Sequence, residues 1–249
     1  MTAQVRYQTV DLSHEGCVRS LNEDAHLVRD DVGLWVVADG MGGHDRGEVA
    51  SGSIVSALQD VGLDGDFEAN LPHIEAALGG VNSALCDISD ASGERLGSTV
   101  AALHIQGLQF ACLWAGDSRI YRLREGVLRQ LTRDHTQVQD LVDHGALTAE
   151  EAKGHPMSHV VSRCIGIDRT FEPETVVGDL EVSDIFLLCS DGLSGMVSDE
   201  EIEASLNAGS RAAADNLLDL AIARGAPDNV TVVTVACEEM TALVLPQEA

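Results

Sequence analysis

The chain has 249 residues, and 45% of them are hydrophobic. This is enough for a substantial core and excludes an intrinsically disordered protein. The formal net charge of −26 excludes a general nucleic-acid binder, because such a field repels the phosphate backbone, and it also disfavours anionic membranes. An acidic surface that maintains solubility explains most of this excess, but the charge also favours capture of divalent cations.

The cysteines and the hydropathy pattern predict a cytoplasmic protein. No cysteine forms a C-x-x-C pair, so we expect reduced thiols rather than disulfides or a zinc site. The N-terminus lacks an apolar segment, and no run reaches the roughly 18 apolar residues of a membrane span. The six cysteines are Cys17, Cys86, Cys112, Cys164, Cys189 and Cys237.

Short apolar segments separated by turns predict a largely antiparallel β protein. Many of these segments are joined by short connections that contain Gly or Asp, which is typical of hairpins. The predicted strands cover residues 6–11, 34–38, 99–105, 108–115, 119–123, 174–179, 185–190 and 230–237.

Two long helices are predicted between the second and third of these strands. Apolar residues recur at helical spacing over residues 50–61 and again over residues 74–88. Gly79 and Gly80 interrupt the second pattern and cost about 1 kcal/mol each relative to Ala, unless they allow close packing.

A second helix pair is predicted near the C-terminal end. Ser198 and Glu201 form a capping-box pattern at the start of one helix, and Ser210 is the expected N-cap of the next, which ends at Gly225. Strands in blocks and helices in pairs predict an α+β fold of one domain covering residues 1–249. Residues 137–166 form a small helical insert in which Thr148 and Glu151 make another capping box.

Several phosphate and acyl-transfer chemistries are excluded by missing motifs. The single lysine, Lys153, does not follow a glycine-rich loop, which excludes P-loop enzymes and protein kinases. No cysteine is followed six positions later by arginine, and neither G-x-S-x-G nor H-E-x-x-H occurs. Carboxylate–metal chemistry remains.

Four aspartates occupy similar positions at the ends of apolar segments. A carboxylate at a buried strand end is costly unless something positive meets it. Each one alone could cap a turn, but four of the same design suggest ligands for hard cations, which prefer oxygen. They are Asp39, Asp117, Asp191 and Asp228, each beside Gly, Ser or Asn.

These aspartates belong to a longer series of motifs. In order and spacing, the series closely resembles the metal-dependent protein Ser/Thr phosphatases of the PP2C (PPM) family, in its compact bacterial form, from about Tyr7 to Ala236. The motifs are Arg19-Ser20-Leu21-Asn22-Glu23-Asp24, Asp39-Gly40-Met41-Gly42-Gly43-His44, Gly97-Ser98-Thr99, Gly116-Asp117-Ser118, Asp134-His135-Thr136, Ser190-Asp191-Gly192 and Asp228-Asn229-Val230-Thr231.

The resemblance implies a four-layer α-β-β-α sandwich with a binuclear Mn²⁺ or Mg²⁺ centre and a possible third ion. Residues 137–166 match the family's flap, and this name is used for them below. The implied roles are Asp39 as the bridge between the metals, Gly40 as a carbonyl ligand, Asp191 and Asp228 as ligands, Glu23 as a ligand through water, Asp117 at the third metal and Arg19 at the substrate phosphate.

The implied function is hydrolysis of phospho-Ser and phospho-Thr by an activated water. The expected partners are phosphorylated proteins, a bacterial Ser/Thr kinase and its targets, with no nucleic acid and no membrane, and the chain is expected to be a monomer. Many eukaryotic members carry a His directly after Asp-Gly, where this chain has Met41. His44 is therefore a candidate acid for the leaving group, with a solvated loop histidine as the alternative.

For some individual residues, the sequence allows more than one role. Arg19 could pair with Glu23 or Asp24 instead of phosphate. Asn22 and Asp24 could orient the metal ligands, Asp134 and His135 could only shape a turn, and Thr99 is expected to be a strand-start hydroxyl. For the whole chain, the alternatives are a catalytically silent PP2C-like binding module and another metal-dependent phosphoesterase, such as a nuclease.

Overall fold

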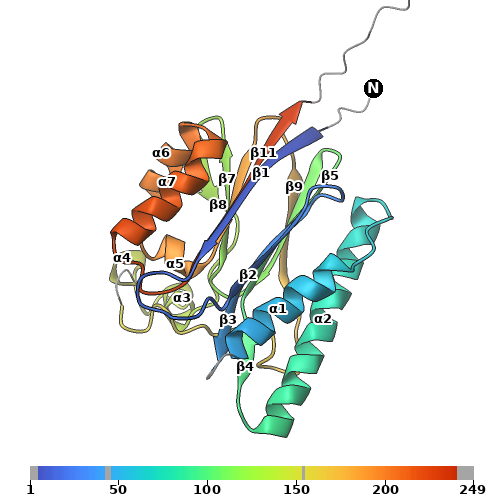
Figure 1. The fold of residues 1–249 in the computed structure, drawn as a ribbon, viewed down its shortest axis with the longest axis vertical. Helices are drawn as coiled ribbons and strands as arrows, with labels where there is room; N and C mark the ends of the chain where they lie inside the picture. Colours follow the sequence, from blue (N-terminus) through green and yellow to red (C-terminus); the bar gives the residue numbers. More distant parts are fainter. Residues whose placement is uncertain (1–4, 43–45, 153–154, 240–249) are drawn as a thin grey trace, which may run out of the picture.

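Two antiparallel β-sheets lie face to face in this computed structural model, which describes residues 5–42, 46–152 and 155–239 (Figure 1). One sheet has five strands and the other has six. The order across the first sheet is β1 (Val5–His14), β11 (Val230–Glu239), β10 (Ile185–Cys189), β7 (Arg119–Arg124) and β8 (Val127–Gln130). The second sheet has the order β2 (Asp24–Arg29), β3 (Leu34–Gly42), β5 (Val100–Gln106), β6 (Gln109–Ala115) and β9 (Glu174–Asp179), and the short β4 (Leu96–Ser98) pairs with β3.

The two sheets bury a shared core because their strands alternate inward and outward residues. Trp35, Phe110 and Phe186 are at most 2% exposed and belong to the cluster between the sheets. The rings of Phe110 and Phe186, one from each sheet, lie 5.1 Å apart between centroids. The long apolar runs of the sequence are therefore strands that are covered on both faces.

Helix pairs cover the two outer faces (Figure 1). Helices α1 (Arg46–Gln59) and α2 (Phe67–Ser92) pack on the second sheet through residues such as Ile54 and Leu78. Helices α6 (Asp199–Asn207) and α7 (Ser210–Ala223) pack on the first sheet, together with the single-turn α5 (Asp191–Ser194). The result is the predicted four-layer α-β-β-α sandwich.

Helix ends follow the sequence signals with one exception. The capping box of Ser198 and Glu201 is formed, and Thr148 and Glu151 exchange the corresponding bonds before α4 (Ala149–Ala152). The predicted N-cap Ser210 is wrong. Gly209 occupies that position with a φ of 130°, and Ser210 is the first helical residue.

The flap lies between β8 and β9 and contains α3 (Gln137–Asp143) and α4. Its C-terminal end is fixed to the second sheet, because Ser98 and Ile165 exchange backbone hydrogen bonds of 3.0 and 2.9 Å. This attachment holds the flap at the end of the sandwich where β3 and β10 end and β11 begins.

Candidate metal centre and active site

Strands β2 and β3 bring the first two carboxylates together. Asp24 and Asp39 are directly opposite each other in the antiparallel register. The N–H of Asp39 donates to Thr99 Oγ1 at 3.0 Å, so Thr99 fixes the strand end, as expected of a strand-start hydroxyl. The next residue must be glycine, because a Cβ on Gly40 would lie 2.1 Å from the carbonyl oxygen of Gly47. Helix α1 can therefore approach the predicted metal site closely.

The Ser-Asp-Gly sequence after β10 places the next carboxylate at the start of α5. Ser190 Oγ donates to Asp24 Oδ2 at 2.7 Å, and Thr231 Oγ1 of β11 donates to the same oxygen at 2.7 Å. A Cβ on Gly192 would lie 1.9 Å from the carbonyl oxygen of Asn229, so glycine is required here too. These contacts bring Asp191 next to the segment that carries Asp228.

Asn229 connects the N-terminal motif to the start of β11. Its Nδ2 donates to the carbonyl oxygens of Glu15 and Leu21 at 3.0 and 2.9 Å, and its Oδ1 accepts from the N–H of Glu23 at 2.8 Å. The loop that contains Arg19 is thereby held against Asp228, although the two residues are far apart in the sequence.

Asp117 lies in the turn between β6 and β7 and is 6% exposed. His135, just before the flap, holds this turn by two hydrogen bonds. Its ring Nδ1 accepts from the N–H of Gly116 at 3.1 Å, and its backbone N–H donates to the carbonyl of Gly116 at 2.9 Å. Asp134 binds Arg119 through both carboxylate oxygens. Asp134 and His135 thus do more than shape a turn, because they support the residues around Asp117.

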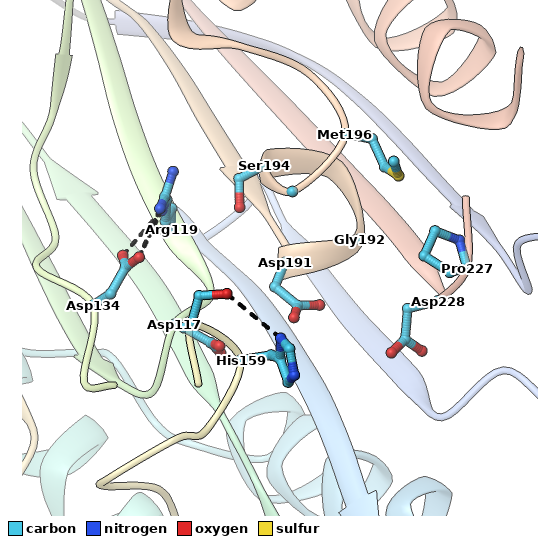
Figure 2. Close-up of a pocket in the computed structure, with 12 residues that line it drawn as sticks. Asp117, Arg119, Asp134, His159, Asp191, Gly192, Ser194, Met196, Pro227 and Asp228 are labelled. Carbon is cyan, nitrogen blue, oxygen red and sulfur yellow. Dashed lines mark hydrogen bonds and ion pairs between the residues drawn. The ribbon is translucent and has the colours of Figure 1, made fainter. Parts of the chain in front are cut away.

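Three of the four predicted aspartates line one cavity of about 420 Å³ (Figure 2). The fourth, Asp39, lies near these aspartates, because the charges of Asp191 and Asp117 raise its pKa beyond the effect of burial. The side chains reach the cavity from the β6–β7 turn, from α5, from the segment before β11 and from the flap. The lining residues are Asp117, Arg119, Asp134, Ser158, His159, Asp191, Gly192, Ser194, Gly195, Met196, Pro227 and Asp228.

The carboxylates repel one another, and burial adds to this effect. Burial raises the pKa of Asp39 well above its usual range, and the charges of Asp24 and Asp191 raise it further. Burial likewise raises the pKa of Asp24 to about 7 and that of Asp117 to about 8. The pKa of Asp191 is also raised, mainly by burial and then by Asp228. Such a cluster favours a cation, because a positive charge offsets both the cost of burying the carboxylates and their mutual repulsion.

Arg19 binds one of the predicted ligands directly. Its Nη2 lies 2.7 Å from Asp228 Oδ2, and the two side chains are 51% and 40% exposed. This hydrogen bond and the charge of Asp228 raise the pKa of Arg19. The ion pair is formed with Asp228 and not with the alternatives Glu23 or Asp24, and it leaves Arg19 half exposed beside the cavity.

Glu23 lies to one side of the four aspartates. Its Oε1 accepts from the N–H of Gly47 at 2.9 Å, at the start of α1. Asp24 lies opposite Asp39, and its Oδ1 is buried without a hydrogen-bond partner among the described residues. Asn22 orients this region, since its Oδ1 accepts from the N–H of Asp24 at 3.1 Å.

The donor chemistry at this site fits hard divalent cations. Carboxylate and backbone oxygens are the ligands that Mg²⁺ and Mn²⁺ prefer, and the unpartnered Oδ1 of Asp24 is a further available oxygen. In the described part of the chain, no group of three His, Cys, Asp or Glu side chains is arranged to hold an ion. The fit therefore rests on the gathered oxygens and their charge, and not on a finished coordination shell.

Several lining residues were not predicted from the sequence, and two of them, His159 and Arg119, are titratable. His159 of the flap lines the cavity, its ring points toward Asp117 in Figure 2, and its charge lowers the pKa of Asp191. Arg119 lines it too and lies between Asp134 and the hydroxyl of Tyr121, 2.8 Å away. The Arg119 position follows Asp117 by two residues and could have been found from that spacing, whereas no periodicity marks His159. The candidate acid His44 lies outside the described residues.

Comparison with known proteins assigns the family. The model of the protein phosphatase 2C family matches residues 16–222. The chain is 41% identical over 224 residues to the serine/threonine protein phosphatase PstP of Mycobacterium tuberculosis, covering 89% of this chain and 43% of that protein. It is 35% identical over 231 residues to the serine/threonine phosphatase stp of Listeria monocytogenes, covering 88% and 92%. The chain belongs to the protein phosphatase 2C family.

A solved structure agrees with this assignment. The catalytic domain of PstP in complex with two manganese ions superposes with a TM-score of 0.85 at 37% identity, covering 95% of this chain and all of that one. The chain spans less than half the length of the PstP sequence it matches. Separately, none of the helices within the described ranges is long and apolar enough to cross a membrane.

Proposed function

We propose that this chain is a metal-dependent protein phosphatase that hydrolyses phospho-Ser and phospho-Thr. The observation that carries this proposal is the gathering of carboxylates from the β6–β7 turn, α5 and the segment before β11 at one cavity, with the carboxylates of β2 and β3 beside them. Such a cluster is unstable alone and suits divalent cations. Membership of the chain in the protein phosphatase 2C family, and its similarity to a serine/threonine phosphatase, support the proposal. The same comparisons support dependence on manganese or magnesium.

Each carboxylate has a proposed role as a metal ligand. We assign Asp39 as the bridge between two cations, Asp191 and Asp228 as further ligands, Asp117 to a third ion, and the carbonyl of Gly40 and a water held by Glu23 to the remaining positions. When bound, divalent cations polarise phosphoryl oxygens and lower the pKa of water, which is the chemistry that hydrolysis of a phosphomonoester needs.

Arg19 is the proposed phosphate-binding residue. One of its Nη atoms binds Asp228, and the guanidinium has further N–H donors on its exposed side. A guanidinium forms paired hydrogen bonds with the oxygens of a phosphate. Its bond to Asp228 would hold the phosphorus near the carboxylates. Water then attacks phosphorus, and the P–O bond to Ser or Thr breaks to give inorganic phosphate and the free hydroxyl.

The proposed substrates are phosphorylated proteins, in particular a bacterial Ser/Thr kinase and its targets. The six cysteines, all within the described residues, are free thiols and suit a reducing compartment. We therefore assign the protein to the cytoplasm. We further propose that it is a monomer with a single domain, whose flap borders the cavity.

Two alternative functions are less well supported. A catalytically silent binding module would have no need for repelling buried carboxylates, all of which this chain retains. A nuclease would have to attract DNA to a molecule with a net charge of −26.

Hydrolysis of p-nitrophenyl phosphate and of a phosphothreonine peptide tests the proposal, with Mn²⁺, with Mg²⁺ and with EDTA. We expect metal-dependent release of phosphate from both substrates. Two matched variants distinguish the effect of losing a site carboxylate from the effect of losing one negative charge. They are Asp191→Asn at the cavity and Asp64→Asn on the exposed α1–α2 loop. Absence of turnover in folded, Mn²⁺-binding protein would favour the binding module, and cleavage of plasmid DNA would favour the nuclease.

A further inference from the structure

A second cavity, of about 320 Å³, lies at the open edge of the first sheet, along β7 and β8. It is lined by arginines, although the chain has only 15 basic residues and a net charge of −26. None of its lining residues borders the carboxylate cavity. They are Arg122, Arg124, Glu125, Val127 and Arg129.

Two of these arginines oppose each other across the β7–β8 pair. Arg122 and Arg129 are register partners, and like charges in this position destabilise a sheet. The guanidinium of Arg122 lies 5.7 Å from the centre of the Phe110 ring, at the edge of the core between the sheets. Its Nε is buried and has no hydrogen-bond partner among the described residues. A buried unpaired donor of this kind costs free energy unless a ligand accepts from it.

The surrounding acids only partly neutralise this cluster. Arg124 binds buried Asp184 at 2.7 and 2.6 Å and Glu181 at 2.7 Å. Burial lowers the pKa of Arg122, and the charges of Arg124 and Arg129 lower it further, whereas Asp184 and Glu181 oppose this. Glu125 is exposed at the hairpin turn. Arg122 and Arg129 thus remain without a carboxylate partner within the described ranges.

We infer that this edge cavity is a binding site for a phosphate group, held between Arg122 and Arg129. Phosphate oxygens would accept from the guanidinium N–H groups of Arg122 and Arg129 at the cavity, and the negative charge would offset the repulsion across the strand pair. Guanidinium groups suit this ligand because their planar array of N–H donors matches phosphate oxygens. The phosphate is either free inorganic phosphate or the phosphoryl group of a protein segment. The inference does not depend on the proposed catalytic function.

NMR of the arginine Nε–H groups tests this site directly in metal-free protein. Potassium phosphate is titrated into the sample, with potassium chloride at equal ionic strength as the reference. We expect the Arg122 Nε–H signal to shift saturably with phosphate only. Arg129→Gln should weaken this binding by roughly 10–100-fold, the usual effect of losing one hydrogen bond to a charged group. Arg211→Gln, which removes the same charge from exposed α7, should leave it unchanged.

Further arms identify the source of the phosphate and exclude misfolding. A phosphothreonine peptide that shifts Arg122 as strongly as inorganic phosphate, while its unphosphorylated form does not, assigns the site to a protein segment. A response to inorganic phosphate alone assigns it to the free ion. Metal-loaded Arg129→Gln should hydrolyse p-nitrophenyl phosphate at the wild-type rate, which shows that it is folded. An unmoved Arg122 signal, or equal phosphate affinity in wild type and Arg129→Gln, would overturn the inference.

Discussion

Side chains of like charge cluster at two places in this molecule, and the two clusters differ in how deeply they are buried. At the end of the sandwich, burial raises the pKa of Asp39 and of Asp191, and neighbouring carboxylates such as Asp24 and Asp228 raise these pKa values further. At the edge of the first sheet, Arg122 and Arg129 repel each other across the β7–β8 pair, and β8 is mostly exposed. Burial increases electrostatic interactions, so the first cluster should be strongly coupled to its ligand and the second only weakly. If both proposals hold, the buried cluster serves chemistry and the cluster at the sheet edge serves recognition.

The largest effect should come from the carboxylates. Asp191→Asn should lower kcat/KM for p-nitrophenyl phosphate by at least about 10³-fold, because a metal ligand supports several kcal/mol of transition-state stabilisation. Steady-state kinetics over a range of Mn²⁺ concentrations measures this loss, and Asp64→Asn is the control. Wild-type rates in Asp191→Asn would contradict the binuclear centre.

Arg19 should have the next largest effect. Arg19→Ala should lower kcat/KM by roughly 10²–10³-fold, as loss of a charge-stabilising group at a reacting centre does. Since Arg19 also binds Asp228, the binding of Mn²⁺ should be measured in parallel by calorimetry. Unchanged kcat/KM would show that Arg19 is only an ion-pair partner of Asp228.

The pH dependence of stability provides a third test. A carboxyl whose pKa is higher in the folded state binds more protons when folded, so the free energy of unfolding falls as pH rises between the two pKa values. For Asp24 and Asp117 the usual value of 3.8 rises to about 7 and about 8. Their contribution should therefore be most favourable below about pH 4 and should decline up to about pH 8.

Denaturant unfolding of metal-free protein across this pH range measures the decline. Asp117→Asn removes one of the titrating groups and should flatten the curve, and added Mg²⁺ should reverse the loss near neutral pH. A slope identical in wild type and Asp117→Asn would show that Asp117 does not contribute to the repulsion.

The arginine cluster should give the smallest effect. Arg129→Gln should raise the free energy of unfolding by about 0.2–1 kcal/mol in phosphate-free buffer, because it removes a like-charge pair across neighbouring strands. Urea unfolding is the measurement, and Arg211→Gln is the control for net charge. A loss of stability would mean that Arg129 makes favourable contacts that exceed this repulsion.

The sequence predicted most strands where burial is strong and missed two strands where it is weak. Residues 185–190 were predicted as a strand and form β10, whose residues are nearly all buried. Strand β8 was missed, because it has only four residues, three of them exposed, and is too short to show an alternating apolar pattern. Strand β2 was missed as well: of its six residues only Leu27 is buried, so its pattern is weak.

The glycines of α2 show how packing overrides local preference. A Cβ on Gly79 or Gly80 would meet no atom within 4 Å outside the local helix backbone, so these residues do not serve close packing. The helix is continuous because Ile74, Leu78 and Leu85 are buried on its other face. The periodicity of apolar residues predicted this helix correctly, because the burial of its apolar face outweighs the low helix propensity of the two glycines.

At the candidate site, residue types were predictable but partners were not. The motifs indicated which aspartates would gather, since each follows or begins an apolar strand. That Arg19 binds Asp228, and that His159 approaches from the flap, depends on loop conformations that have no periodic signal.

The pairing of β1 with β11 also bears on how the protein is made. These strands come from the two ends of the described chain and pair from Val5–Glu239 to His14–Val230. A ribosome releases Asp24 and Asp39 early, but Asp228 and its neighbour Asn229 emerge only with the last strand. Because contacts between distant segments form late in folding, the carboxylate cluster should be completed only after β11 has been synthesised. A nascent chain that ends before β11 would therefore have Asp24 and Asp39 but not the pairing that places Asp228 beside them.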